Sequence, residues 1–339
     1  MEILENISLK SDNTFGIDVI AKYYYTIDSA EAFIALSQTE IFQNNKYLLL
    51  GGGSNVLFTS DYDGLIIKNN LKGISIVEEN NDHIILNVGS GENWHEFVLY
   101  CIENNWGGIE NMSLIPGTVG AAPIQNIGAY GIEIKDILIS VETIEIDSSR
   151  AFTFKNKDCL FDYRSSIFKG LYKGKHFITN VQLKLTKQNH LISTQYGDIQ
   201  GVLSERNISQ PTIKNVSDAV ISIRQSKLPD PKIIGNAGSF FKNPIINQSQ
   251  FEVFIASHPE APSYKVGDHK VKVPAGWLIE QCGWKGKVIG NTGSHAKQAL
   301  VLVNHGNAEG NEVKTLAHKI IASVKTKFGI DIEPEVNII

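Results

Sequence analysis

The feature that most constrains this chain is a long stretch of small residues near its middle. Residues 114–131 read LIPGTVGAAPIQNIGAYG, with four glycines, two prolines and no charged side chain. A solvated loop of this length would normally carry charge. The composition therefore favours backbone laid against a large, extended ligand, with its N–H groups meeting oxygen atoms. The alternative is a buried crossover packed under a helix.

A second glycine loop, GGGSN at residues 51–55, lies between the apolar runs YLLL and VLF. Consecutive glycines allow positive φ, and their N–H groups can form an anion-binding nest to which Ser54 and Asn55 add side-chain donors. The loop lacks the Lys-Ser/Thr ending of a P-loop, and a strand rather than a helix follows it. Alone it could be a tight turn between strands. Two such loops in one strand-rich half indicate a dinucleotide cofactor held by backbone groups.

Composition and charge exclude several classes of protein. A chain of 339 residues suits two or three domains, and a net charge of −5 argues against nucleic acid as the main partner. Cys101, Cys159 and Cys282 are widely separated and odd in number, which favours reduced thiols over disulfides or a metal site. No secretory signal and no membrane-spanning apolar run is recognisable. We expect a cytoplasmic monomer without a metal.

Residues 1–210 are rich in strand patterns. Strands are expected in YLLL, VLF, GLIIK, HIILNVG and 177–185, and a hairpin around Asp147–Arg150. A helix is expected in GENWHEFVLYCIENNW, because Trp94, Phe97, Val98 and Cys101 follow helical spacing.

Helical patterns dominate afterwards. In NVSDAVISIRQSK an apolar face begins at Val216, with Asn215 as the expected N-cap, and the prolines of LPDPK end the helix. A second helix is expected over 311–328, followed by Gly329 as its C-terminal cap. The chain finishes with the strand-like IDIEPEVNII.

Taken together, these motifs resemble one family. NTFGID, LGGGSNVLF, IPGTVGAAPIQNIGAYG, CLFDYRSSIFK, KLPDPK, GNAGSFFKNP, PAGWLIEQCGWKG and IEPEV occur in the order found in UDP-N-acetylenolpyruvoylglucosamine reductases, and they span residues 13–336. The YGD segment, Tyr196–Asp198, resembles the longer subtype of that family. The resemblance implies reduction of the enolpyruvyl UDP-sugar to UDP-N-acetylmuramate, for peptidoglycan precursor synthesis.

The resemblance also implies an α+β fold and two cofactors. FAD would be bound non-covalently by a region of the vanillyl-alcohol-oxidase (PCMH) type at 1–212, in subdomains of roughly 1–70 and 71–212. A substrate-binding domain would occupy 213–330, and 331–339 would return as a strand to the active site. NADPH would be the hydride donor.

Three residues match the catalytic positions of the family. Arg164 would grip the substrate carboxylate, because a guanidinium stays charged and meets a carboxylate with two donors. Ser239, in GNAGSFFKNP, would donate a proton to the carbanion. Glu335 would act protonated or through water, with a raised pKa; Glu333 is its rival, since alternation places both on one strand face. Without the resemblance, a surface arginine and a turn-capping serine are the simpler interpretations.

Further residues match binding positions. Those expected at the cofactor are Gly51, Gly52, Gly53, Ser54, Asn55, Val56, Gly117, Gly120, Ala121, Ala122, Ile124, Gly128 and Tyr130. Those expected at the substrate are Tyr163, Tyr196, Lys227, Asn243 and Gln298. Ala121 and Ala122 depart from relatives that carry serines there, which bears on cofactor affinity.

Two rival functions stay open from the sequence. One is an FAD-dependent sugar or alcohol oxidase of the same fold, although neither glycine loop contains a histidine for a covalent flavin link. The other is an inert UDP-sugar-binding protein, against which the complete set of three catalytic matches argues.

Overall fold

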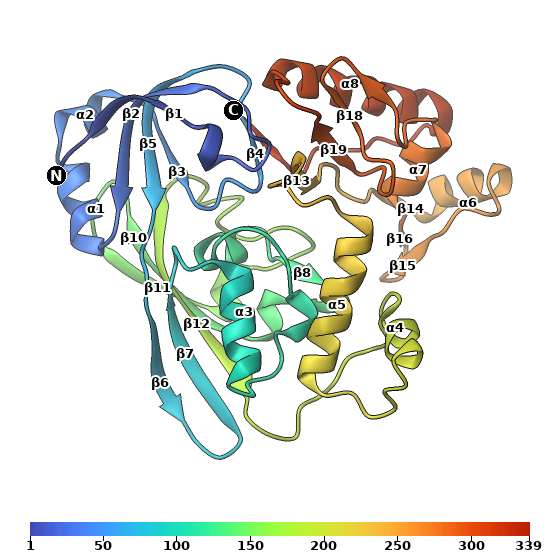
Figure 1. Cartoon of the computed structure of the whole chain (residues 1–339), viewed down its shortest axis with the longest axis horizontal. Coiled ribbons are helices and arrows are strands. Elements are labelled where there is room, and N and C mark those ends of the chain that lie inside the picture. Colours follow the sequence, from blue (N-terminus) through green and yellow to red (C-terminus); the bar gives the residue numbers. More distant parts are fainter. The chain divides into compact units, whose positions relative to one another are not determined.

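The computed structural model describes residues 1–339 and contains two compact units (Figure 1). Unit 1 is formed by Met1–Ile7, Ala21–Gly52 and Asp63–Ser226, and unit 2 by Ser8–Ile20, Gly53–Tyr62 and Lys227–Ile339. Both units contain helices and strands, as expected for an α+β protein.

Each unit combines segments that are far apart in the sequence, whereas the sequence predicted domains that follow one another along the chain. Two early segments fold with the last third of the chain. Thr14 N donates to Gly53 O at 3.1 Å, and Asn304 Nδ2 donates to Phe15 O at 2.9 Å. Gly310 lies against the backbone of Phe58, where a Cβ would clash. Contacts between residues this far apart leave no trace in local composition, so the predicted boundaries missed them.

Unit 1 contains two larger sheets. One has the order β1-β2-β5-β3, and the other the order β11-β10-β12-β7-β6. Their strands are β1 Leu4–Ser8, β2 Ile20–Ile27, β3 Tyr47–Leu50, β5 Tyr62–Asn69, β6 Ile74–Glu79, β7 His83–Gly89, β10 Leu138–Glu145, β11 Ala151–Lys155 and β12 His176–Thr186. The strands β8 Gly128–Ala129 and β9 Ile132–Glu133 form a further, two-stranded sheet in this unit. The predicted strands in these segments and the hairpin between β10 and β11 are confirmed.

Two cores stabilise these sheets. Helices α1 Ala30–Ser37 and α2 Glu40–Asn44 supply Phe33, Leu36 and Phe42 to one core. Helix α3, Trp94–Glu103, packs into the second core, and all four residues of its predicted face are buried. Asn93 caps α3, because its side chain accepts a hydrogen bond from Glu96 N at 3.1 Å.

Helix α5, Ile213–Lys227, ends before the prolines as predicted, but its start was predicted wrongly. Asn215 Oδ1 accepts from Thr212 N at 3.0 Å, while Asn215 N donates to Thr212 Oγ1 at 3.3 Å. This reciprocal pair makes Thr212 the cap and Asn215 its partner three residues on. Apolar residues of α5 pack with α4, Ile199–Glu205, so nearly all of α5 belongs to unit 1.

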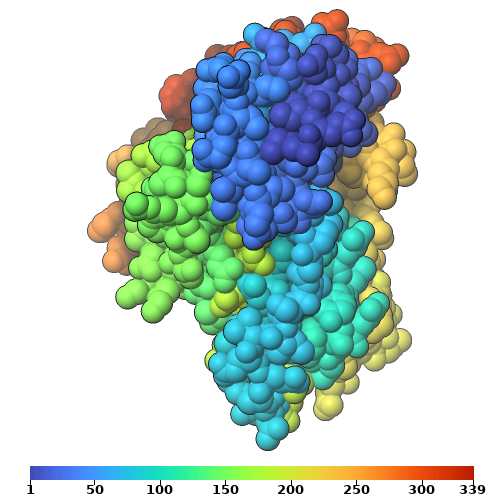
Figure 2. Space-filling view, turned by 90° about the vertical axis from the view of Figure 1, so that its left-hand side faces the viewer, coloured from blue at the N-terminus to red at the C-terminus, as the bar shows by residue number.

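The edge strand β6 is largely exposed, including Ile76 and Val77. Figure 2 shows the face on which the light-blue and cyan segment containing β6 and β7 reaches the surface. Glu78 and Glu79 place charge on this edge, which disfavours pairing with another chain.

Unit 2 holds a four-stranded sheet, β13-β19-β18-β17, with smaller sheets β14-β16-β15 and β20-β4. Its strands are β4 Val56–Leu57, β13 Gly235–Ser239, β14 Ile245–Asn247, β15 Tyr264–Val266, β16 Lys270–Lys272, β17 Val288–Ile289, β18 Thr292–Ser294, β19 Val301–Asn304 and β20 Asn337–Ile338. Its helices are α6 Gln248–Ser257, α7 Ala275–Gln281 and α8 Gly310–Phe328. The predicted last helix is confirmed, and Gly329 caps it with φ 67°.

One buried histidine in unit 1 gives the stability a pH dependence. His176, on β12, lies edge-on to Phe154 and Tyr172, with ring centroids 5.1 and 4.9 Å away. Its Nδ1 is 3.0 Å from Thr143 Oγ1. Burial lowers the pKa of His176 from its ordinary value of 6.5, and Lys175 lowers it further, against the raising effect of Glu145.

We expect the free energy of unfolding to fall as the pH drops below about 6.5. Below that pH, His176 binds a proton more readily in the unfolded chain than in the folded chain, because its pKa is lower in the folded chain. Above that pH the imidazole is neutral in both states, so it adds no pH dependence to the free energy of unfolding. Denaturant unfolding at pH 7.5 and at pH 5.5 measures the difference, which should be smaller in His176→Gln. An equal difference in the variant would assign the pH dependence to other groups.

Candidate active site

The two glycine loops meet within unit 1. A Cβ on Gly51 would lie 2.7 Å from Thr118 Oγ1, and one on Gly52 would lie 3.1 Å from Gly117 Cα. A Cβ at either position would force its neighbour to shift, which favours glycine. The N–H groups of Gly51, Gly52, Gly117 and Thr118 donate to no other part of the chain. They form a set of unused donors of the kind that binds a diphosphate.

Several N–H groups in the rest of the long glycine loop already donate hydrogen bonds within the chain. Val119 N donates to Glu92 O at 2.9 Å, Gly120 N to Ser90 O at 2.8 Å, and Ala121 N to Thr118 O at 3.0 Å. Residues 119–124 form a 3-10 turn in which Ala122 is buried. The packing of residues 119–124 fits the interpretation as a buried crossover, while binding of a ligand by the rest of the stretch stays a prediction. The N–H groups of Gly120 and Ala121 are used within the chain, and the expected place of these two residues at the cofactor stays a prediction.

Gly53 is the loop position where glycine matters most for stability. It has φ 63°, and a Cβ there would clash with Asp12 O. We expect Gly53→Ala to lose about 1–3 kcal/mol of unfolding free energy. Gly16 is a matched control, because it has φ 66° but open space around a Cβ. Urea unfolding should show a larger loss for Gly53→Ala than for Gly16→Ala; equal losses would reject the clash.

Arg164 occupies a strained turn of unit 1. It has φ 52°, a left-handed conformation that is uncommon outside glycine, and Asp162 and Ser165 close the turn with two backbone hydrogen bonds of 3.1 Å. The guanidinium is directed at the long glycine loop, because Nη2 donates to Gly128 O at 2.8 Å. Its Cζ lies 5.6 Å from the ring centroid of Tyr163. Strain at a defined side chain is typical of a functional site.

The same loop gathers other predicted residues. Ile124 O accepts a hydrogen bond from Ser166 Oγ at 2.6 Å, which ties the Arg164 turn to the loop. Tyr130, with φ 50°, lies over Gly197, and Tyr196 lies over Gly131. Tyr196 is 49% exposed, so its ring can reach a ligand.

Ser239 ends β13 in unit 2 and is exposed. The backbone is irregular between Asn236 and Ser239. Asn236 Oδ1 accepts from Gly238 N at 2.9 Å, and Gly238 has φ 67° with open space around a Cβ. Phe240 and Phe241 follow as buried residues. Ser239 Oγ makes no hydrogen bond within the chain, so no base is placed to turn it into a nucleophile.

The C-terminal segment of unit 2 distinguishes the two candidate carboxylates. Glu335 N donates to Phe240 O at 2.7 Å, so Glu335 lies opposite the residue after Ser239. Glu335 is half-buried. Glu333 has a side chain 74% exposed that pairs with Lys242 at 3.4 Å. Glu335 is the better placed of the two for chemistry at Ser239.

Two predicted substrate residues meet at the start of α7. Asn243 Oδ1 accepts from Ala275 N at 2.9 Å, and a Cβ on Gly276 would lie 3.1 Å from Gln298 Oε1. Phe240 N donates to Leu300 O at 2.8 Å, which keeps this group close to Ser239. Lys227 is the exposed last residue of α5.

At the C-terminal segment, Asn337 N donates to Asn55 O at 3.0 Å, and β20 pairs with β4 through Asn337 and Val56. Gly53, Ser54, Asn55 and Val56 belong to unit 2, and their expected role at the cofactor stays a prediction.

Sequence reasoning missed one charged group in unit 1. Arg224 Nε is buried, and no atom of the chain accepts a hydrogen bond from it. Arg224 follows Val220 by four positions and Val216 by eight, so it continues the apolar stripe of α5. A charged residue on a buried stripe is the signal that could have identified it.

His95, on α3, was also missed. Its Nδ1 accepts a hydrogen bond from Leu114 N at 3.0 Å, and Leu114 has φ 59°. Burial lowers the pKa of His95, and Arg224 lowers it further. The neutral ring therefore fixes the strained entry to the long glycine loop.

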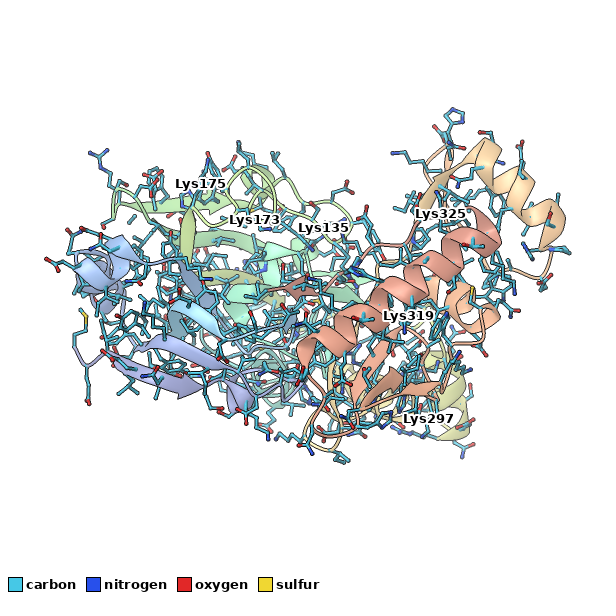
Figure 3. All side chains as sticks on the ribbon, turned by 90° about the horizontal axis from the view of Figure 1, so that it is seen from above. Lys135, Lys173, Lys175, Lys297, Lys319 and Lys325 are labelled. Atoms are coloured by element: carbon cyan, nitrogen blue, oxygen red, sulfur yellow. The ribbon has the colours of Figure 1, made fainter.

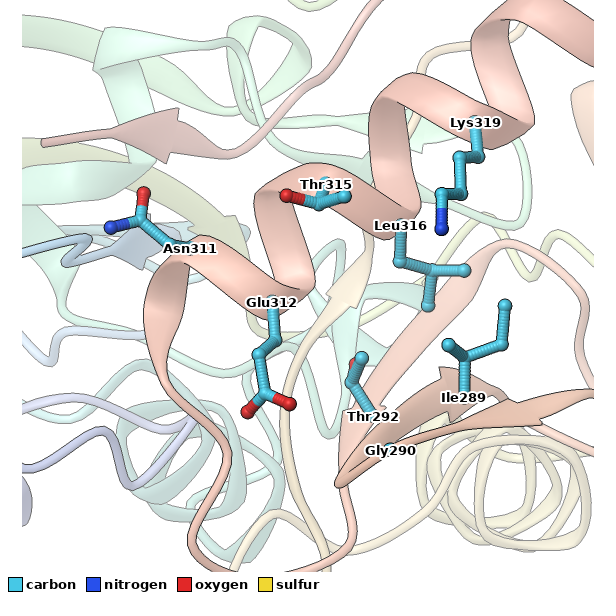
Figure 4. Close-up of a pocket in the computed structure, with 8 residues that line it drawn as sticks. All are labelled: Ile289, Gly290, Thr292, Asn311, Glu312, Thr315, Leu316 and Lys319. Atoms are coloured by element: carbon cyan, nitrogen blue, oxygen red, sulfur yellow. The ribbon is translucent and has the colours of Figure 1, made fainter.

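A cavity of about 290 Å³ in unit 2 lies apart from every predicted residue. Figure 4 shows it between α8 and the β17–β18 hairpin, with Leu316, Ile289 and Lys319 among its lining side chains. Two of the lysines labelled in Figure 3 are held in ion pairs. Lys325 pairs with Asp331 at 2.5 Å, and Lys135 pairs with Glu133 at 2.6 Å.

No three His, Cys, Asp or Glu side chains lie where they could hold a metal ion together. None of the helices has both the length and the apolar character needed to cross a membrane.

Comparisons with known proteins identify relatives of this chain. Residues 21–150 match the family model "FAD binding domain", and residues 230–339 match "UDP-N-acetylenolpyruvoylglucosamine reductase, C-terminal domain". A UDP-N-acetylenolpyruvoylglucosamine reductase of Flavobacterium johnsoniae is 53% identical over 100% of both chains. One of Chromobacterium violaceum is 46% identical over 99% of this chain and 98% of its own.

A solved structure supports the fold. The crystal structure of UDP-N-acetylenolpyruvylglucosamine reductase from Thermus caldophilus covers 99% of this chain and 98% of its own, with a TM-score of 0.67 at 22% identity. The predicted fold class and the predicted FAD cofactor are confirmed by these matches. The chain therefore belongs to the UDP-N-acetylenolpyruvoylglucosamine reductase family of FAD-dependent enzymes.

Proposed function

We propose that this chain reduces UDP-N-acetylglucosamine enolpyruvate to UDP-N-acetylmuramate with NADPH as the reductant. The observation that carries the proposal is the 53% identity, over the whole length of both chains, to a protein named as this reductase. Arg164, Ser239 and Glu335 occupy the three catalytic positions that the resemblance implies.

Unit 1 has features that fit FAD. The unused N–H groups of Gly51, Gly52, Gly117 and Thr118 would hold its diphosphate, since consecutive backbone donors suit phosphate oxygens. Bound FAD would supply the hydride chemistry that links NADPH to the vinyl carbon of the substrate. Gly53 keeps the loop in the conformation that exposes these donors.

Arg164 binds the carboxylate of the enolpyruvyl group. Addition of hydride to the vinyl carbon places negative charge on the α carbon and, by delocalisation, on that carboxylate. A guanidinium with two donors stabilises the charge as it develops. The bond from Arg164 Nη2 to Gly128 O holds the guanidinium in a fixed direction beforehand.

Ser239 donates its Oγ proton to the α carbon. A hydroxyl is a weak acid, but the carbanion is a strong base, so no further activation of the serine is needed. Its exposure and the lack of side-chain bulk at Gly238 allow close approach. Glu335, protonated or through a bridging water, stabilises the same charge; an ionised carboxylate would repel it.

The UDP-sugar is held by the remaining predicted residues. Lys227 and Asn243 contact the diphosphate, since an ammonium group and an amide N–H both suit phosphate oxygens. Gln298, Tyr163 and Tyr196 contact the rest of the substrate. The chain functions in the cytoplasm as a monomer, without nucleic acid or membrane partners.

An anaerobic spectroscopic titration tests the proposal. The purified protein, reconstituted with FAD, should lose its visible flavin absorbance when NADPH is added. The absorbance should return when the enolpyruvyl UDP-sugar is added in the absence of oxygen. Failure of the second step would contradict the proposed substrate.

The same experiment separates the rival functions. An oxidase would be bleached by an alcohol or sugar substrate and recover only with oxygen. An inert UDP-sugar-binding protein would show no bleaching by NADPH. Denaturation should release the flavin from the chain, because the binding is non-covalent.

A further inference from the structure

The cavity between α8 and the β17–β18 hairpin of unit 2 has no part in the proposed mechanism. Its volume of about 290 Å³ lies at the lower end of the range found for ligand pockets, so it suits a small molecule. Four of its lining residues, Glu312, Thr315, Leu316 and Lys319, follow one another at helical spacing along α8. They form one face of the helix, which lies opposite the hairpin in Figure 4.

The floor of this cavity is mainly hydrocarbon. Leu316 is buried, and Ile289 lines the cavity from β17. Thr292 is buried as well, and its hydroxyl already donates to Val303 O at 2.9 Å, so that proton is not available to a ligand. The floor therefore favours a ligand that has an apolar part.

The two charged groups of the cavity have opposite signs and lie seven residues apart on α8, about 10.5 Å along the helix axis. Lys319 is exposed, and its Nζ takes part in no ion pair or hydrogen bond within the chain. Glu312 Oε2 accepts a hydrogen bond from Glu309 N at 2.9 Å. Its Oε1 lies against the turn of the hairpin, where a Cβ on Gly290 would be 3.0 Å away. An ammonium group and a carboxylate oxygen are therefore both left for a ligand.

The spacing of these charges defines the length of a matching ligand. An ammonium group of the ligand would pair with Glu312, and a carboxylate would pair with Lys319. The two charges of a free amino acid lie too close together to reach both ends. An extended dipeptide is roughly 7 Å long, and a charge-assisted hydrogen bond of about 2.7–2.9 Å at each end covers the rest. Thr315, whose hydroxyl has no partner in the chain, lies between the two charges and suits the peptide group.

We propose that this cavity is a binding site for a short zwitterionic peptide, in which Glu312 receives the ammonium group of the peptide and Lys319 receives its carboxylate. None of the lining residues is among those assigned to FAD or to the UDP-sugar, so the site is separate from the reaction centre. Two partly exposed ion pairs and a small apolar contact hold the peptide. Binding is therefore weak and becomes weaker as the salt concentration rises.

An NMR titration of the isotope-labelled full chain, with FAD bound, tests the proposal. Glycyl-leucine at millimolar concentrations should shift the amide signals of Gly290 and Thr315 along a saturable curve. N-acetyl-glycyl-leucine lacks the ammonium group, and glycyl-leucine amide lacks the carboxylate. Each analogue should bind about fivefold more weakly or worse, the loss expected for one ion pair. Equal binding of either analogue, or shifts that do not saturate, would overturn the proposal.

Variants of α8 test the two charges from the protein side. Lys319→Gln should weaken glycyl-leucine binding by about fivefold, and Lys319→Arg should restore most of it. Glu312→Gln should weaken binding similarly, while its amide oxygen can still accept from Glu309 N and keep the start of α8 capped. Lys314→Gln, on the same helix but outside the cavity, is the matched control and should bind as the wild type does.

Thermal unfolding of each variant checks that α8 remains folded. Wild-type affinity in both Lys319→Gln and Glu312→Gln would overturn the proposal. An equal loss in Lys314→Gln would also overturn it, because the effect would then belong to the net charge of the helix and not to the cavity.

Discussion

Replacing Ser239 with alanine should slow the reduction of the enolpyruvyl substrate by about 10²- to 10⁴-fold, the range expected for loss of a positioned proton donor. Reduction of the bound flavin by NADPH should remain nearly unchanged, because that step needs no proton from Ser239. Stopped-flow absorbance measures the two half-reactions separately. Ser239 is exposed and makes no hydrogen bond within the chain, so the melting temperature should hardly change.

Two controls sharpen the Ser239 experiment. Ser239→Cys keeps a proton donor of similar size and should retain more of the second half-reaction than alanine does. Ser249→Ala, at an exposed position at the start of α6, should leave both half-reactions unaffected. Equal slowing of both half-reactions by Ser239→Ala would show that the serine positions a ligand instead of protonating the substrate.

Arg164→Lys should lower kcat/KM for the enolpyruvyl substrate by about 10²- to 10³-fold, comparable to removal of one preorganised donor for a developing anion. Lysine keeps the charge and a long aliphatic stem but cannot present two parallel donors. It also loses the 2.8 Å bond to Gly128 O that fixes the direction of the guanidinium.

Steady-state kinetics and thermal unfolding of Arg164→Lys decide between a catalytic and a structural arginine. The left-handed turn at residue 164 remains strained with either side chain, so the melting temperature should fall little. A large fall with a proportionate loss of activity would mean that Arg164 mainly holds the turn. Reduction of flavin by NADPH provides the internal control.

Local patterns in the sequence predicted individual elements well. The buried face of α3 and the extent of α8 follow from helical periodicity, and the β10–β11 hairpin follows from its turn residues. The glycine loops were recognised because a cluster of glycines indicates that the backbone is constrained there. Gly52 and Gly117 approach so closely that a Cβ on Gly52 would require the backbone of Gly117 to shift.

What the sequence could not predict depends on contacts between distant residues. The sequence around Gly53 does not predict that the backbone of Asp12 lies against it. The sequence around Glu335 does not predict its hydrogen bond to Phe240 O. Arg224 shows a further limit. Its position on an apolar stripe is visible in the sequence, but the absence of a partner is a property of three-dimensional packing.

The interleaving of the chain has a consequence for its folding. β4 pairs with β20, and all of the strands from β5 to β19 lie between these two in the sequence. The pairing of β4 with β20 therefore requires closure of a very large loop, which makes it a slow, non-local step in the folding of unit 2.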